Sequence, residues 1–225
     1  MSKPGQFESM TKDFGVPQPK SDGVNLVTCP KWADNFGYDG FGAYADILVG
    51  SSGQRFRFVK MSSTTKSDVG IWVGDTLVSQ ALWVEAKMRN ESYYQGDPHR
   101  AVERVTYYEA SFAASRLGAR LPTLNEFKVV AHDFSVNLNG STYVPPFSHD
   151  HRRGPSSANN LGIFDIYDPI RTWVSPNEFC IGNWPAFGRA IGAAFSDTGS
   201  FISFQEKVAR LDSRSPMIGV RLVKE

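Results

Sequence analysis

Residues 118–127 read GARLPTLNEF and contain the boundary between two predicted helices. Gly118 follows residues 106–117, which hold neither glycine nor proline, and a glycine in this position favours the left-handed conformation that ends a helix. Thr123 and Glu126 have the spacing of a capping box, in which the hydroxyl and the carboxylate each accept a backbone N–H of the first turn. We therefore expect one helix to end at this glycine and the next to begin at Thr123.

The capping-box spacing also occurs upstream, at Thr106 and Glu109. It predicts that the first of these helices runs over residues 106–117. A further helix is expected over residues 77–88 because this segment has an apolar stripe, which consists of Leu77, Ala81, Leu82 and Trp83.

Short strands are expected on both sides of these helices. Residues 54–61 alternate polar and apolar side chains, and residues 69–73 and 218–223 have the composition of two further strands. After about His132 the sequence is rich in Gly, Pro, Ser and Asn, which are typical of turns and loops. A few short helices among short strands indicate an α+β fold.

The composition excludes several classes of protein. Among 225 residues, 24 Lys+Arg against 23 Asp+Glu give a net charge of +1, so no nucleic-acid partner is expected. Two cysteines, Cys29 and Cys180, are too few for a disulfide framework, and they are either free thiols or a single pair. No segment approaches the roughly 18 apolar residues of a membrane helix, and the first residues lack the apolar core of a signal peptide.

Several blocks of the sequence, in the same order, resemble the formylglycine-generating enzyme (sulfatase-modifying factor) family. The most specific block is residues 118–127, which resembles the family string GKRLPTEAEW. The other matching blocks are LVSQALW (77–83), NESYYQGD (90–97), VTYYEA (105–110), NLGIFDI (160–166), GNW (182–184) and SPMIGVR (215–221). The resemblance implies a C-type-lectin-like fold for one domain over residues 51–225, which follows an arm and lead-in segment over residues 1–50.

The chemistry of that family depends on a copper-binding cysteine pair that this sequence lacks. In the family the pair follows a GGSW segment, whereas residues 185–192 here read PAFGRAIG and contain no sulfur. Cys180 precedes the segment and Cys29 is remote in sequence. Because copper(I) prefers thiolate ligands, the resemblance implies a catalytically empty version, a pseudoenzyme without catalytic residues or a copper cofactor.

The sequence contains two other candidate metal sites. The family segment GNVWEW, which helps hold a structural calcium in many relatives, is replaced here by residues 168–173, DPIRTW. Asp165 and Asp168 still offer oxygens to calcium, although turn formation is the simpler interpretation. His149 and His151 could bind a transition metal through a His-x-His pair, but no third ligand has a characteristic spacing, and a solvated loop is the simpler interpretation.

The late aromatic segment holds the candidate partner-binding residues. In C-type-lectin-like folds this segment lies on an exposed face that binds ligands, and core packing is the alternative for most of its aromatic side chains. Trp, Phe and Arg are enriched where binding energy concentrates. The candidates are Trp184, Phe187, Arg189, Phe195, Asp197 and Phe201.

These features predict a non-enzymatic binding or assembly protein. The resemblance to catalytically empty versions in bacteriophages favours a virion-associated structural, decoration or host-recognition protein of the tail-fibre type. Such a protein binds a protein or a glycan, works in an oligomer or a larger complex, and is located in the virion, or otherwise in the cytoplasm. Two alternatives stay open: a metal-dependent oxidase of the family that acts on a peptide cysteine, and a bacterial cytoplasmic accessory protein.

Overall fold

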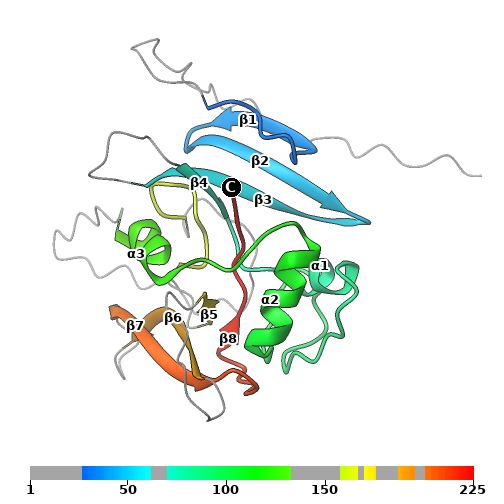
Figure 1. Cartoon of the computed structure of the whole chain (residues 1–225), viewed down its shortest axis with the longest axis vertical. Helices are drawn as coiled ribbons and strands as arrows, with labels where there is room; N and C mark the ends of the chain where they lie inside the picture. The colour runs from blue at the N-terminus through cyan, green and yellow to red at the C-terminus, as the bar shows by residue number, and fades with distance from the viewer. Residues whose placement is uncertain (1–26, 62–69, 133–157, 167–169, 176–186, 196–200) are drawn as a thin grey trace, which may run out of the picture.

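The computed structural model describes residues 27–61, 70–132, 158–166, 170–175, 187–195 and 201–225 (Figure 1). The helices are α1 (Gln80–Glu85), α2 (Tyr107–Arg116) and α3 (Leu124–His132). The strands are β1 (Asn35–Asp39), β2 (Gly42–Val49), β3 (Ser52–Lys60), β4 (Gly70–Gly74), β5 (Arg171–Val174), β6 (Phe187–Phe195), β7 (Phe201–Arg210), β8 (Ile218–Gly219) and β9 (Val223–Lys224). Figure 1 shows β1 to β3 at one end of the molecule and β6 and β7 at the other, with the helices between them.

The first sheet has the strand order β1-β2-β3-β4-β9, and all of its pairs are antiparallel. Along β2 the side chains of Ala43, Ala45 and Ile47 are buried while those between them are less so, as in a strand that has one face on a core. The strands predicted at residues 54–61 and 69–73 are confirmed as β3 and β4. Residues 35–49, which the sequence placed in the lead-in segment, supply β1 and β2.

The second sheet has the strand order β7-β6-β5-β8, with β5 and β8 parallel. The single strand expected over residues 218–223 is wrong, because the chain forms β8 here and then β9 in the other sheet. Arg221 lies between them, 1% exposed, and its guanidinium donates to the carbonyls of Gly74 and Phe164 at 2.7 Å each. These bonds hold residue 221 between the two sheets, so the chain leaves its pairing with β5 and continues to pair with β4.

The predicted caps of α2 are confirmed. Thr106 Oγ1 accepts the N–H of Glu109 at 3.2 Å, Glu109 Oε2 accepts the N–H of Thr106 at 2.9 Å, and Gly118 has a φ of 60°. The helix expected over residues 77–88 is shorter in the structure, because Ser79 Oγ accepts the N–H of Leu82 at 3.1 Å and caps the helix there. None of the helices in the described part of the chain is long and apolar enough to cross a bilayer.

Residues 118–127 join α3 to the last strand. The guanidinium of Arg120 donates to both carboxylate oxygens of Glu126 at 2.7 Å each. Glu126 Oε2 also accepts the N–H of Thr123 at 2.7 Å, and Thr123 Oγ1 accepts the N–H of Glu126 at 3.2 Å, so the predicted start of this helix is confirmed. The backbones of Arg120 and Val223 exchange two hydrogen bonds of 2.9 and 2.8 Å. The motif therefore fixes the start of α3 against β9.

The core contains the side chains of three tryptophans, Trp72, Trp83 and Trp173, which are 4%, 1% and 0% exposed. The indole Nε1 of Trp173 donates to the carbonyl of Val105 at 2.9 Å, and its ring meets the ring of Tyr107 edge-on at 5.9 Å. The tryptophan of the DPIRTW segment therefore joins β5 to the start of α2.

Candidate functional site

The β6–β7 hairpin determines which side chains of the late segment reach the surface. Gly188, Ala190 and Gly192 alternate along β6, and a Cβ atom on Gly192 would lie 2.9 Å from the Cα of Arg171. Because these small residues allow β6 to lie close to β5 and Trp173, the residues between them project to the opposite face of the hairpin.

That opposite face, here called the hairpin face, consists of side chains paired across the two strands. The register places Phe187 opposite Arg210, Arg189 opposite Val208, and Ile191 opposite Glu206. Residues directly opposite each other in an antiparallel pair share one face of the sheet. At one end of the face the large apolar side chains of Phe187 and Val208 are 50% and 64% exposed.

At its other end the hairpin face meets α3 in an apolar groove. The groove has a volume of about 770 Å³, and it is lined by Phe127, Lys128, Ala131, Ile191, Phe204, Gln205 and Glu206. The rings of Phe127 and Phe204 meet edge-on at 5.7 Å across it. Figure 1 shows α3 directly above β6 and β7, which is the arrangement that forms these walls.

Charged groups border the groove on the side of the hairpin face. The carboxylate of Glu206 forms an ion pair with Lys128 Nζ at 3.2 Å and accepts a hydrogen bond from Arg189 Nη1, also at 3.2 Å. The groove is of the size that small ligands occupy, and it combines an apolar floor with a few convergent polar groups. This arrangement suits an apolar side chain or a sugar ring with polar substituents.

The structure brings together two of the six binding candidates from the sequence. Phe187 and Arg189 share the hairpin face, whereas Phe195 and Phe201 are backbone partners at the far end of the same hairpin. Trp184 and Asp197 lie outside the described residues. The sequence did not identify Lys128 and Glu206, because only the tertiary packing of α3 on the hairpin brings them beside Arg189.

The metal candidates lie mainly outside the described residues, where Asp168, His149, His151 and Cys180 are found. Asp165 has a φ of 58°, and its Oδ2 accepts the N–H of Leu77 at 3.2 Å, so this carboxylate joins its loop to the segment before α1. Cys29 is an exposed free thiol. In the described ranges, no group of three or more His, Cys, Asp and Glu side chains could hold a metal ion.

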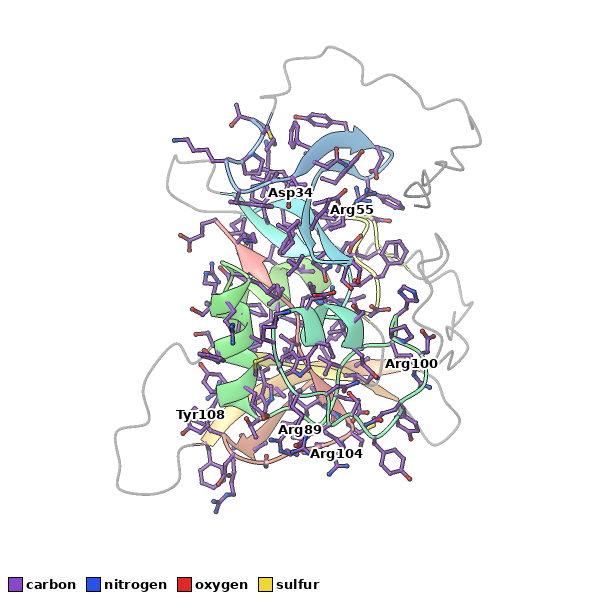
Figure 2. The ribbon with its side chains drawn as sticks, turned by 90° about the vertical axis from the view of Figure 1, so that its right-hand side faces the viewer. Asp34, Arg55, Arg89, Arg100, Arg104 and Tyr108 are labelled. Carbon is purple, nitrogen blue, oxygen red and sulfur yellow. The ribbon has the colours of Figure 1, made fainter. Side chains whose placement is uncertain are left out.

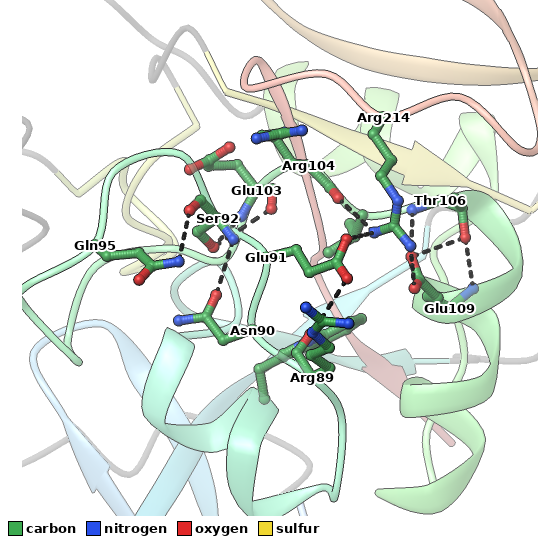
Figure 3. A network of polar contacts seen from close by, with 12 residues as sticks. Arg89, Asn90, Glu91, Ser92, Gln95, Glu103, Arg104, Thr106, Glu109 and Arg214 are labelled. Atoms are coloured by element: carbon green, nitrogen blue, oxygen red, sulfur yellow. Dashed lines mark hydrogen bonds and ion pairs between the residues drawn. The ribbon is translucent and has the colours of Figure 1, made fainter.

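A second polar region lies on the loop before α2, and Figure 3 shows it from close by. Arg214 contacts the carboxylate of Glu91 at 3.3 Å and that of Glu109 at 2.6 Å, while Arg89 contacts Glu91 at 3.3 Å. Burial raises the pKa of Glu109, but the bonds from Thr106 and Arg214 outweigh burial and lower it. In Figure 2, Arg89, Arg104 and Tyr108 lie at one end of the molecule and Asp34 and Arg55 toward the other.

The same loop contains a buried carboxyl group. Glu103 is 1% exposed, and its Oε1 accepts the N–H of Tyr94 at 2.9 Å. Burial raises the pKa of Glu103 despite this bond. Because the acidic groups of the region bond to the loop backbone or to neighbouring arginines, we interpret the region as a structural network that fixes residues 89–104 against α2.

The fold and the hairpin face define a mixed α/β domain with two short sheets and a groove beside one of them. No protein-family model matches the sequence, and a search of curated proteins finds no match. Several solved structures are similar to the chain. "Treponema denticola variable protein 1" is 15% identical with a TM-score of 0.57, and the alignment covers 80% of this chain and 98% of that one.

Two further solved structures align with most of the chain. PvdO from Pseudomonas aeruginosa is 12% identical with a TM-score of 0.51, over 87% of this chain and 100% of that one. CarF is 18% identical with a TM-score of 0.49, over 80% of this chain and 97% of that one. PvdO has a fold like that of formylglycine-generating enzymes, so the likeness supports the fold part of the resemblance seen in the sequence.

Proposed function

We propose that this protein is a non-enzymatic binding or assembly protein with a C-type-lectin-like fold of the formylglycine-generating-enzyme type. It binds a protein or a glycan through the hairpin face and the groove beside α3. In this proposal its setting is a bacteriophage virion, where it is a structural, decoration or host-recognition protein. The observation that carries the proposal is the groove itself, an apolar hollow that continues into exposed apolar side chains on the same hairpin.

Two properties of this surface support binding. Phe187 and Val208 project from a two-stranded ladder, so a partner meets side chains whose backbone is already ordered, and ordering costs little of the binding energy. The charges of Lys128, Arg189 and Glu206 border the apolar floor and supply orientation. The sequence adds a third argument, because residues 185–192 lack the cysteines that the chemistry of the related enzymes needs.

Binding is tested with labelled protein on an array of bacterial surface glycans and on the separated proteins of purified phage particles. Phe187→Ala and Arg189→Glu should each weaken binding at least about tenfold, as expected for side chains at the centre of a contact. Val84→Ala is the matched control, because Val84 is also an exposed apolar residue, 51% exposed, but belongs to α1. If all three variants bind as tightly as the unmodified protein, the hairpin face is not the binding surface.

The enzymatic alternative is tested on the same preparation. Purified protein is analysed for copper and iron and is then mixed with a cysteine-containing peptide while oxygen is monitored. Stoichiometric metal together with oxygen consumption and loss of the peptide thiol would overturn the non-enzymatic proposal.

A further inference from the structure

β7 is a long strand at the edge of its sheet. It runs over ten residues and pairs with β6 on one side, and no other strand of the described chain lies along its outer side. An edge strand presents backbone N–H and C=O groups that can pair with a strand from another molecule.

The side chains of β7 carry opposite charges at a spacing that is complementary to itself. Glu206, Val208 and Arg210 share the hairpin face, and all three are exposed. When two copies of β7 pair antiparallel about a two-fold axis through Val208, each Glu206 lies opposite the partner's Arg210. The two exposed valines then meet at the axis.

Neighbouring registers lack this match. An axis through Glu206 places two carboxylates opposite each other, and an axis through Lys207 places two ammonium groups opposite each other. Like charges directly opposite on paired strands are destabilising, whereas opposite charges stabilise the pair. The Val208-centred register is therefore favoured over both.

We propose that the protein forms a two-fold symmetric dimer through β7, in which the four-stranded sheets of two copies join edge to edge. The same patch is used by both copies, as a closed two-fold interface requires. The contacts that Arg210 and Glu206 already make are surface ion pairs. Arg210 pairs with Asp212, with side-chain exposures of 51% and 57%, and Glu206 pairs at 3.2 Å with Lys128 and Arg189, which are 56% and 59% exposed. Such surface pairs are weak, so the Arg210 guanidinium can turn toward the partner's Glu206, and the Glu206 carboxylate can accept from it. This dimer does not depend on the function proposed above.

Charge reversal tests the pairing with the full chain. The molar mass of the unmodified protein, measured by light scattering during size-exclusion chromatography or by sedimentation equilibrium, should be that of a dimer. Glu206→Arg alone and Arg210→Glu alone each place like charges opposite each other twice per dimer. Each should raise the dissociation constant at least about tenfold, which corresponds to about 1.4 kcal/mol.

Mixing the two variants gives the decisive measurement. In the mixture, the new arginine of Glu206→Arg lies opposite the new glutamate of Arg210→Glu, and the unchanged Arg210 of the first variant lies opposite the unchanged Glu206 of the second. Both pairs then have opposite charges. A heterodimer should therefore form from two variants that are each monomeric alone. Lys207→Glu is the control, because Lys207 lies on the other face of β7, opposite the partner's Ala209, and should leave the dimer intact.

Three results would overturn the proposal. The first is an unmodified protein that stays monomeric up to its solubility limit. The second is an oligomer that neither single reversal weakens. The third is a mixture of the two variants that remains monomeric although circular dichroism shows that both are folded.

Discussion

The contact between Arg120 and Glu126 should contribute more to stability than any exposed ion pair of the same arginine. Replacing Glu126 with alanine removes two 2.7 Å bonds from the guanidinium and the 2.7 Å bond from the N–H of Thr123. The carboxylate side chain is only 11% exposed and the arginine is 35% exposed. The change therefore leaves a half-buried charge without its main partner.

The expected loss follows from two contributions. Losing a helix cap costs about 1 kcal/mol, and hydrogen bonds to a charged group are worth about 1.5 to 3 kcal/mol. Because water still reaches part of Arg120, we take the lower end of that range and expect Glu126→Ala to reduce the free energy of unfolding by about 2 to 3 kcal/mol in total.

Urea unfolding followed by circular dichroism measures this loss. With an m-value of about 2 kcal/mol/M, the midpoint should fall by about 1 M. Glu225→Ala is the matched control, because Glu225 contacts the same arginine at 3.2 Å but is 80% exposed. Its loss should stay under about 0.5 kcal/mol. Equal midpoints for the two variants would refute the argument that burial and capping make the Glu126 contact strong.

The effect should also depend on pH in a defined direction. Burial raises the pKa of Glu126, but the bonds from Arg120 and Thr123 outweigh it, so the folded-state pKa lies below its ordinary value. The stabilisation is fully present above the unfolded-state pKa of about 4.3 and is lost as pH falls through the folded-state pKa. The difference between the unmodified protein and Glu126→Ala should therefore shrink in acid, and a difference that grows there would contradict the assignment.

Two further predictions concern the buried Arg221 side chain and the glycine that ends α2. Arg221→Met should reduce the free energy of unfolding by at least about 2 kcal/mol in the same urea assay, because two buried carbonyls lose their donors. An unchanged midpoint would show that these bonds are dispensable. Gly118→Ala should reduce the free energy of unfolding by about 1 kcal/mol, because Gly118 has a φ of 60°, which is strained for alanine. Ala119→Gly is the control, because it exchanges the same two residue types at the next position, whose φ is not positive.

Local sequence signals predicted the helix boundaries well. The pairs Thr106 with Glu109 and Thr123 with Glu126 lie three residues apart, so their hydrogen bonds could be anticipated from spacing alone. The prediction that a helix begins at residue 77 was wrong, because the helix begins after Ser79, whose hydroxyl caps it. Serine is a common capping residue, so the sequence did contain a local signal for the correct start.

Structural features that depend on contacts between distant parts of the chain could not be predicted from the sequence. The division of residues 218–223 between two sheets follows from Arg221, whose carbonyl partners are 147 and 57 residues away in sequence. The rim of the groove likewise depends on Lys128 and Glu206, which no periodicity connects. For the binding candidates, alternation along β6 could place Phe187 and Arg189 on one face, but it could not show that α3 forms a groove beside them.

The passage of residues 218–224 from one sheet to the other has a consequence for biosynthesis. β8 and β9 complete different sheets, and Arg221 and Val223 supply the bonds that anchor Gly74 and Arg120. While the ribosome is still making the preceding residues, neither sheet has its last strand, and such long-range pairing is slow. Until this segment is made, β4 and β5 each lack one neighbouring strand, and an unpaired strand edge in a partly folded chain favours aggregation.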